Sequence, residues 1–142
     1  MNSIEAGKKQ TCKSILVIDD DTDEQELLVD AFHEERPEYH ITCQDNGKSG
    51  FCYLQQLNDN ELPDLIVLDY NMPGWSGADV LHKLQQMPRL KRIPVVIYSN
   101  SGTFHANATS GAKAFVQKAS TWQGIKENIK SFLLYGQDVF VQ

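Results

Sequence analysis

The stretch LIVLDYNMPGWSG, residues 65–77, decides how this sequence folds. Its first four residues, 65–68, are all aliphatic and have the composition of a strand that is buried on both faces. Asp69 follows this apolar run directly. Strands of this kind are typical of parallel sheets, in which ligands bind just beyond the carboxyl ends of the strands.

On both sides of this stretch, apolar runs alternate with amphipathic segments. Five apolar runs are predicted to be strands, at residues 14–19, 39–43, 65–68, 93–98 and 113–117. Apolar residues at helical spacing predict helices over residues 24–35, 49–57, 77–87 and 125–133, and a weaker helix over 102–110. Five strands, each followed by a helix, predict a parallel sheet covered on both faces.

Composition and charge exclude several classes of protein. The 142 residues, of which 41% are hydrophobic and 23% charged, are typical of one globular domain. The formal net charge of -6 argues against binding to nucleic acid or to an anionic membrane, both of which need a surplus of Lys and Arg. No apolar run approaches the roughly 18 residues that span a bilayer. Cys12, Cys43 and Cys52 form neither a metal motif nor a disulfide framework, which favours reduced thiols in a cytoplasmic protein.

The predicted elements occupy residues 14–136, which we take as one domain. Residues 1–13 are polar, lack the apolar stretch of a signal peptide and are interpreted as a short extension. Residues 137–142 are interpreted as a tail. We therefore expect a single-domain protein located in the cytoplasm.

Polar residues cluster just after the predicted strands. Asp19 and Asp20 follow the first strand, Asp69 the third, Ser99 the fourth and Lys118 the fifth. If the strand order is 2-1-3-4-5, the first and third strands are neighbours at the point where the order reverses. The carboxylates then converge on one pocket, beside the hydroxyl and the ammonium group.

Carboxylates this close together must either remain partly protonated or be neutralised by a cation. At about 4 Å and an effective dielectric constant near 20, each pair repels by roughly 4 kcal/mol. Oxygen ligands with few protein donors suit Mg²⁺, which binds one or two carboxylates, several waters and a phosphate oxygen. Lys118 and Ser99 can contact other oxygens of the same phosphate. The pattern therefore indicates phosphoryl transfer, which depends mainly on positioning and charge neutralisation.

Four segments resemble the receiver domain of the response regulators of two-component systems: ILVIDDDTD (15–23), LIVLDYNMPGWSG (65–77), IPVVIYSNS (93–101) and GAKAFVQK (111–118). The resemblance extends from about residue 14 to about residue 134, nearly the whole chain. It implies an α/β, flavodoxin-like fold with a doubly wound, five-stranded parallel sheet of order 2-1-3-4-5.

The resemblance also implies a role for each site residue. Asp69 corresponds to the phosphoacceptor. Mg²⁺ would be bound by Asp20, by Asp69 and by the backbone carbonyl of Asn71, with Asp19 acting through a water molecule.

The switch residues are assigned by the same resemblance. Lys118 corresponds to the family's lysine, Ser99 to the switch hydroxyl and Phe115 to the switch aromatic residue. After phosphorylation Ser99 would move inward and leave space for Phe115 to rotate.

By the same resemblance, the protein is a phosphoacceptor switch of a phosphorelay and is not an enzyme with an external substrate. It would catalyse only its own phosphorylation and dephosphorylation. The donor would be a phosphohistidine on a histidine kinase or a phosphotransfer protein, and the signal would pass to a downstream protein. We expect a monomer or weak dimer, with no nucleic-acid or membrane partner.

Two residues depart from the family pattern. Asn100 stands where the family generally has Ala or Gly, and Ala119 stands where it generally has Pro. A cis bond before a residue other than proline costs about 2.5–4 kcal/mol, so we predict a trans Lys118–Ala119 bond. Thr121 or Ser120 is expected to cap the last helix.

Two other functions are considered. VIDDDTD superficially resembles the DxDx[TV] motif of haloacid-dehalogenase hydrolases, but Asp23 occupies the place of the final Thr or Val. A receiver-like module that is not phosphorylated would have lost an acid, the acceptor or the lysine, and none is lost here. Incubation with Mg²⁺ and acetyl phosphate or beryllofluoride separates these alternatives from the receiver.

Overall fold

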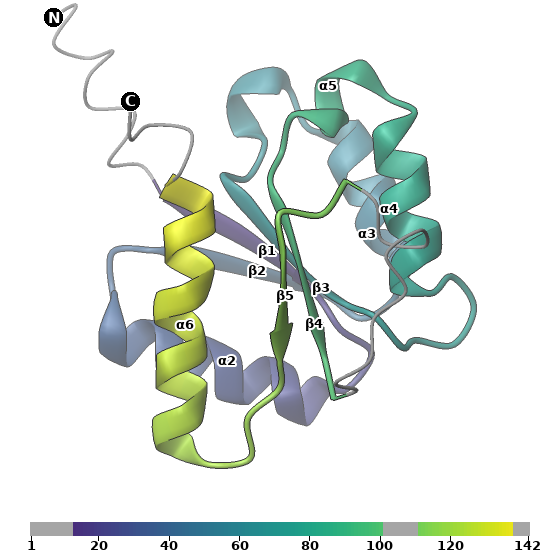
Figure 1. Cartoon of the computed structure of the whole chain (residues 1–142). Coiled ribbons are helices and arrows are strands. Elements are labelled where there is room, and N and C mark those ends of the chain that lie inside the picture. Colours follow the sequence, from purple (N-terminus) through teal and green to yellow (C-terminus); the bar gives the residue numbers. More distant parts are fainter. Residues whose placement is uncertain (1–12, 101–110, 138–142) are drawn as a thin grey trace, which may run out of the picture.

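The computed structural model describes residues 13–100 and 111–137. These residues form one five-stranded parallel sheet of order β2-β1-β3-β4-β5, which confirms the predicted fold and strand order (Figure 1). The strands are β1 (Ser14–Ile18), β2 (His40–Gln44), β3 (Leu65–Asp69), β4 (Val95–Ser99) and β5 (Ala114–Gln117).

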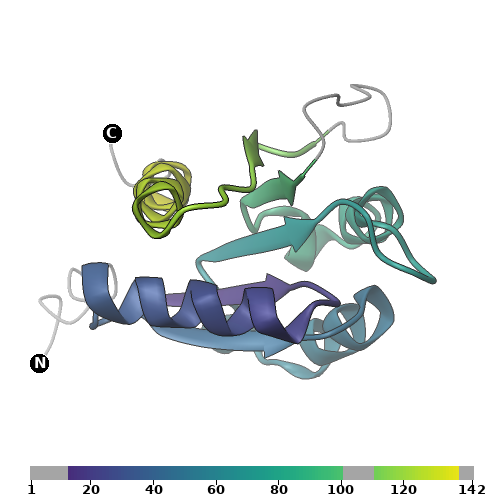
Figure 2. The ribbon, with the colours of Figure 1, turned by 90° about the horizontal axis from the view of Figure 1, so that it is seen from below.

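Helices cover both faces of the sheet (Figures 1 and 2). One face is covered by α2 (Thr22–Glu35) and α6 (Trp122–Gln137), which contact each other. The other face is covered by α3 (Gly47–Gln56), α4 (Gly77–Gln85) and the short α5 (Pro88–Lys91). A 3-10 helix, η2 (Asp59–Glu61), precedes β3.

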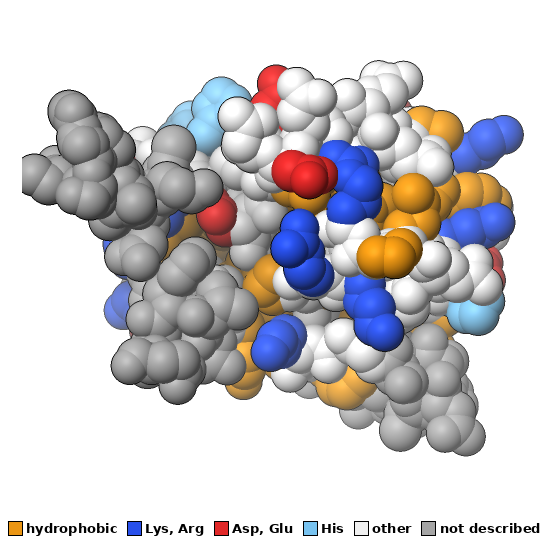
Figure 3. Space-filling view, turned by 90° about the horizontal axis from the view of Figure 1, so that it is seen from above, with side chains coloured by type: hydrophobic (Ala, Val, Ile, Leu, Met, Phe, Trp, Pro, Cys, Tyr) orange, Lys and Arg blue, Asp and Glu red, His pale blue; other side chains and the backbone are white. Residues whose placement is uncertain are grey.

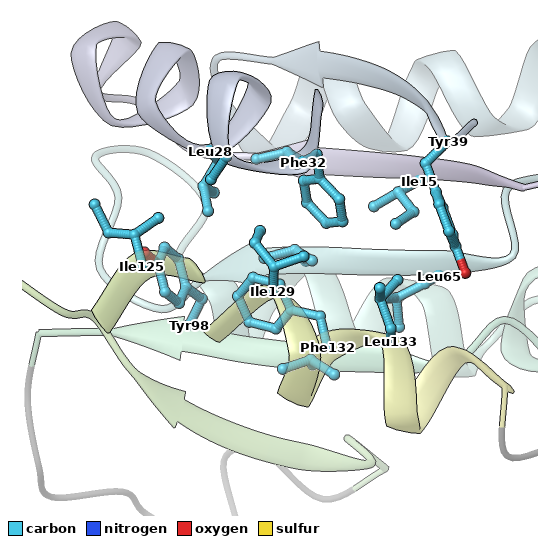
Figure 4. Close-up of a cluster of buried hydrophobic side chains, with 14 residues drawn as sticks. Ile15, Leu28, Phe32, Tyr39, Leu65, Tyr98, Ile125, Ile129, Phe132 and Leu133 are labelled. Atoms are coloured by element: carbon cyan, nitrogen blue, oxygen red, sulfur yellow. The ribbon is translucent and has the colours of Figure 1, made fainter. Parts of the chain in front are cut away.

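The two faces contain separate apolar cores, because successive side chains of a strand point to opposite sides. In β1, Ile15 and Val17 belong to the core under α2 and α6, whereas Leu16 and Ile18 belong to the core under α3 and α4. Figure 4 shows the first core, where side chains from α2 and α6 meet those from the strands. Full burial of one such side chain contributes about 1.5–3 kcal/mol, so the two cores hold the strand ends in place.

Helix caps determine where the helices that follow the acidic strand ends begin. The Asp21 side chain accepts hydrogen bonds from the backbone N–H groups of Asp23 and Glu24, so α2 begins two residues before its predicted start. The Thr121 hydroxyl accepts a hydrogen bond from the Gly124 N–H at 3.0 Å, which confirms one of the two predicted caps of α6.

Two boundaries around α5 differ from the prediction. Pro88 was expected only to end a helix, but it begins α5. Proline is favoured there because a backbone N–H in the first turn of a helix has no intrahelical acceptor. The fourth strand was predicted from Ile93 but begins at Val95, after Pro94. The weak helix predicted over residues 102–110 lies outside the described residues. No peptide bond between described residues is cis, so the predicted trans Lys118–Ala119 bond is confirmed.

The two ends of the sheet differ in charge. Buried acids lie at the carboxyl ends of two strands, Asp19 directly after β1 and Asp69 at the end of β3. Lys and Arg side chains gather at the opposite end (Figure 3), where α5 and the segment before β5 contribute Arg89, Lys91, Arg92 and Lys113. Among the described residues, no helix is long and apolar enough to cross a membrane.

Candidate functional site

The carboxyl ends of β1, β3, β4 and β5 bring the predicted residues together. Asp69 is the last residue of β3 and pairs in register with Tyr98 of β4. The Lys118 N–H donates to the Ser99 carbonyl at 2.8 Å, which places the start of the loop after β5 beside the end of β4. The Asp19 N–H donates to the Gln44 carbonyl at 3.1 Å. Continued strand pairing therefore fixes the backbone of each of these residues.

The polar groups of this pocket are buried. Asp19 is 1% exposed, Asp69 4% and Ser99 0%. The Lys118 side chain is 7% exposed. Charged groups are rarely this deeply buried unless they are paired, so these burials require compensating partners.

Lys118 provides one such partner. Its Nζ lies 3.4 Å from Asp69 Oδ1 and 3.6 Å from Asp19 Oδ2. A third carboxylate is closer, because Glu24 Oε1 accepts a hydrogen bond from the same Nζ at 2.5 Å. One ammonium group is therefore shared by three carboxylates.

Burial dominates the protonation of the two aspartates. Burial, together with the smaller effect of the Asp69 charge, raises the pKa of Asp19 to about 7, although a hydrogen bond from the Asp21 N–H lowers it. Burial likewise raises the pKa of Asp69 to about 6, against the lowering effect of Lys118. Burial by itself would lower the pKa of Lys118, but the Glu24 hydrogen bond and the neighbouring carboxylates raise it above its ordinary value.

The same carboxylates suit a divalent cation. One oxygen each from Asp19, Glu24 and Asp69 lie within 4.8 Å of one another. Asp19 Oδ2 is buried and accepts no hydrogen bond from any described residue, since Lys118 Nζ at 3.6 Å is too distant. An all-oxygen set with an unsatisfied buried carboxylate oxygen fits a hard cation such as Mg²⁺.

Two predicted metal ligands lie at the edge of this cluster. The Asn71 N–H donates to Asp69 Oδ1 at 3.3 Å, so the Asn71 backbone is adjacent to the predicted acceptor. Asp20 is exposed, and the group of converging carboxylates found among the described residues does not include it. The Asp20 charge nevertheless contributes to the raised pKa of Asp69.

Phe115 and Asn100 lie on different parts of the β4–β5 side of the sheet. The predicted switch aromatic, Phe115, is 38% exposed on the edge strand β5. Asn100 lines a cavity of about 170 Å³ together with Glu24, Tyr98 and Lys118. Asn100, which departs from the family pattern, therefore lines a cavity next to Lys118.

Glu24 is the residue that the sequence analysis missed. It lies in the first turn of α2, within the acidic run that begins at Asp19, where a carboxylate is also explained by the positive end of the helix dipole. The one available signal is its position about one helical turn beyond Asp20 and Asp21, which keeps it near the end of β1.

Gly77 explains how the loop after β3 packs against the pocket. Its N–H donates to the Tyr70 carbonyl at 2.8 Å, and a Cβ at this position would lie 2.5 Å from the Asp69 carbonyl oxygen. Only a residue without a side chain allows α4 to start this close to Asp69.

The receiver-domain model of response regulators matches residues 15–130. The chain belongs to this family. Receiver domains are signalling proteins of two-component systems, and phosphorylation on an aspartate and binding of Mg²⁺ are general to them. The predicted family is therefore confirmed for this receiver.

Curated relatives and solved structures agree with this membership. The receiver is 33% identical to response regulator Rcp1 of Synechocystis over 92 residues, which cover 63% of each chain. It spans between 39% and 63% of the length of this relative and of two rice response regulators that it also matches.

Two solved structures share both fold and sequence with the receiver. The phosphorylated cyanobacterial phytochrome response regulator RcpA superimposes with a TM-score of 0.73 at 26% identity, over 85% of this chain and 94% of that one. Response regulator TrrA of Thermotoga maritima, in complex with Mg²⁺ and BeF, gives a TM-score of 0.69 at 27% identity, over 84% and 98% of the two chains.

Proposed function

We propose that Asp69 accepts a phosphoryl group from a phosphohistidine on a histidine kinase or phosphotransfer protein. The observation that supports this most directly is the placement of Asp69. Asp69 is 4% exposed at the end of β3, and its Oδ1 lies 3.4 Å from the Lys118 ammonium group. A carboxylate oxygen of Asp69 would attack phosphorus, the P–N bond would break, and the imidazole would leave.

Bound Mg²⁺ would supply positive charge to the phosphoryl oxygens during this transfer. We assign its ligands to Asp20, Asp69 and the backbone carbonyl of Asn71, with Asp19 acting through water. The buried Asp19 oxygen without a hydrogen bond and the Asn71 N–H bond to Asp69 support this assignment. Lys118 would neutralise another phosphoryl oxygen, as a point charge does in many phosphate sites.

The phosphorylated receiver would act as a switch for a downstream protein. A phosphoryl group adds about -1.5 to -2 of charge at neutral pH, which would attract the Ser99 hydroxyl and Lys118. Ser99 is fully buried at the end of β4, and Phe115 is 38% exposed on the neighbouring strand. Inward movement of Ser99 followed by rotation of Phe115 would change the surface at β5, where a partner would bind. We propose a cytoplasmic protein that is a monomer or weak dimer before phosphorylation.

The proposal is tested by labelling with acetyl phosphate in the presence of Mg²⁺. Asp69→Asn removes the nucleophilic carboxylate at nearly constant volume, so labelling is expected to disappear while the far-UV circular dichroism spectrum stays unchanged. Asp30→Asn, on the exposed side of α2, is the matched control and should be labelled like the wild type.

Undiminished labelling of Asp69→Asn would contradict the assignment of the acceptor. Sustained turnover of a phosphoester by the wild-type protein would instead support the hydrolase alternative.

A further inference from the structure

Glu24 is the nearest anion to the lysine of the site. The distance from Lys118 Nζ to Glu24 Oε1 is 2.5 Å, compared with 3.4 Å to Asp69 Oδ1. The first contact is a charge-assisted hydrogen bond that is shorter than usual, whereas the second lies at the long limit of such a bond. In this state of the protein, Lys118 therefore interacts more strongly with α2 than with the proposed acceptor.

The surroundings of Lys118 leave its ammonium group few alternative positions. The side chain is 7% exposed, and Nζ lies 5.4 Å from the centre of the Tyr98 ring, within the range of a cation–π contact. Among the described residues, the groups within salt-bridge distance are the carboxylates of Glu24, Asp69 and Asp19. A stronger interaction with one of them therefore weakens the interactions with the others.

Glu24 differs from the other two carboxylates in its freedom to move. Its side chain is 30% exposed, and it lines the cavity of about 170 Å³ beside Lys118. Asp19 and Asp69 are almost fully buried at the ends of strands. Glu24 can therefore withdraw toward solvent or the cavity when Lys118 turns toward a phosphoryl group, without any change in the sheet.

We propose that Glu24 is a positioning residue that retains Lys118 in the unphosphorylated state and competes with the phosphoryl group on Asp69 for its ammonium group. This inference rests on the proposed function, because it concerns the same lysine. Its consequence is that Glu24 lowers the occupancy of the phosphorylated state. The competing interpretation is that Glu24 is a metal ligand, since its carboxylate lies within 4.8 Å of those of Asp19 and Asp69.

The first experiment measures the affinity for beryllofluoride at saturating Mg²⁺, by ¹⁹F NMR of the bound fluoride. Glu24→Gln keeps the shape of the side chain and removes its charge, so the variant should bind beryllofluoride roughly five- to tenfold more tightly, as expected when a competing charge-assisted hydrogen bond is lost. Glu26→Gln removes the same charge from an exposed position two residues further along α2 and should match the wild type. Glu24→Asp should lie between the wild type and Glu24→Gln.

The second experiment follows the Lys118 ammonium group itself, by ¹⁵N NMR of protein labelled at its lysine side chains and assigned with Lys118→Arg. Without beryllofluoride, Glu24→Gln should shift the Lys118 Nζ signal and Glu26→Gln should not. With beryllofluoride bound, the wild type and Glu24→Gln should give the same signal, because Lys118 then contacts the fluorides in both. If Glu24 had only a structural role, its substitution would shift the Lys118 Nζ signal both with and without bound beryllofluoride.

Two results would overturn the inference. Equal beryllofluoride affinities and unchanged Lys118 signals in Glu24→Gln would show that Glu24 does not restrain the lysine. A loss of Mg²⁺ affinity in Glu24→Gln, measured by calorimetry, together with weaker beryllofluoride binding, would show that Glu24 is a metal ligand. If the wild type bound no beryllofluoride, the proposed function would fail, and the Lys118 signals of the free proteins would still decide the role of Glu24.

Discussion

The two ends of the sheet contain charges of opposite sign in very different surroundings. At the carboxyl end, Asp19 and Asp69 are 1% and 4% exposed and share the ammonium group of Lys118. At the amino end, Lys91 and Arg92 are exposed to solvent around α5 (Figure 3). Exposed ion pairs and charges typically contribute less than about 1 kcal/mol, whereas buried charges have strongly shifted pKa values. Burial rather than the number of charges therefore distinguishes the carboxyl end of the sheet, where we propose that this receiver is phosphorylated.

The largest effect that this comparison predicts is a dependence of stability on pH. Burial raises the pKa of Asp19 to about 7 and that of Asp69 to about 6, from 3.8. Below pH 3.8 both carboxyls are protonated whether the chain is folded or not. As the pH rises toward 7, ionisation is favoured in the unfolded chain and opposed in the folded one. The two groups should therefore lower the free energy of unfolding over this range, by roughly 7 kcal/mol in total if the two shifts are added.

Urea unfolding at several pH values, with and without Mg²⁺, measures this effect. Mg²⁺ should suppress the loss of stability, since the cation binds the ionised carboxylates. The control is the double variant Asp19→Asn, Asp69→Asn, in which both the loss and the Mg²⁺ effect should be reduced. A wild-type protein whose stability responds to pH and Mg²⁺ like this variant would contradict the importance of burial.

The second prediction separates the two acids after β1. Asp20 is exposed and is assigned as a direct metal ligand, whereas Asp19 is buried and is assigned a water-mediated role. Asp20→Ala should therefore weaken Mg²⁺ binding by a factor on the order of 10 to 100 relative to the wild type. Asp19→Ala should weaken it less. The affinities are measured by Mg²⁺ titration of Trp75 fluorescence, with Asp23→Ala as a control outside the site. Equal losses in the two variants would show that the metal is bound differently.

The smallest effect is expected at the amino end. Lys91→Gln removes an exposed charge that forms no ion pair with the described residues, so the free energy of unfolding should change by less than about 0.5 kcal/mol. Affinity for beryllofluoride should be unchanged. Denaturation midpoints and ¹⁹F titrations test both statements, and a change larger than 1 kcal/mol would show that this basic surface contributes to the fold.

Much of the fold follows from patterns that are local in the sequence. The aliphatic run of β3 is buried at every residue, as its composition predicts. The boundaries were predicted less well where one residue type has two roles. Pro88 ends α4 in the sequence pattern, but it also begins α5, because proline is favoured in the first turn of a helix. The helix propensity of proline does not show whether Pro88 only ends α4 or also begins α5. The packing of Leu90 against the core stabilises the helical turn that follows Pro88.

The family and the strand order are predicted from the resemblance of the sequence to receiver domains. The convergence of Asp19, Asp69, Ser99 and Lys118 then follows because the carboxyl ends of parallel strands share one edge. No sequence pattern predicts the contact between Glu24 and Lys118, which is seen in the folded chain. The two residues are 94 positions apart, and their contact depends on the first turn of α2 lying beside the loop that follows β5. The tertiary structure also decided that Asp19 is buried and Asp20 exposed, because the chain turns into α2 between the strand end and the Asp21 cap. Adjacent residues of the same type thus differ in solvation, which their sequence does not reveal.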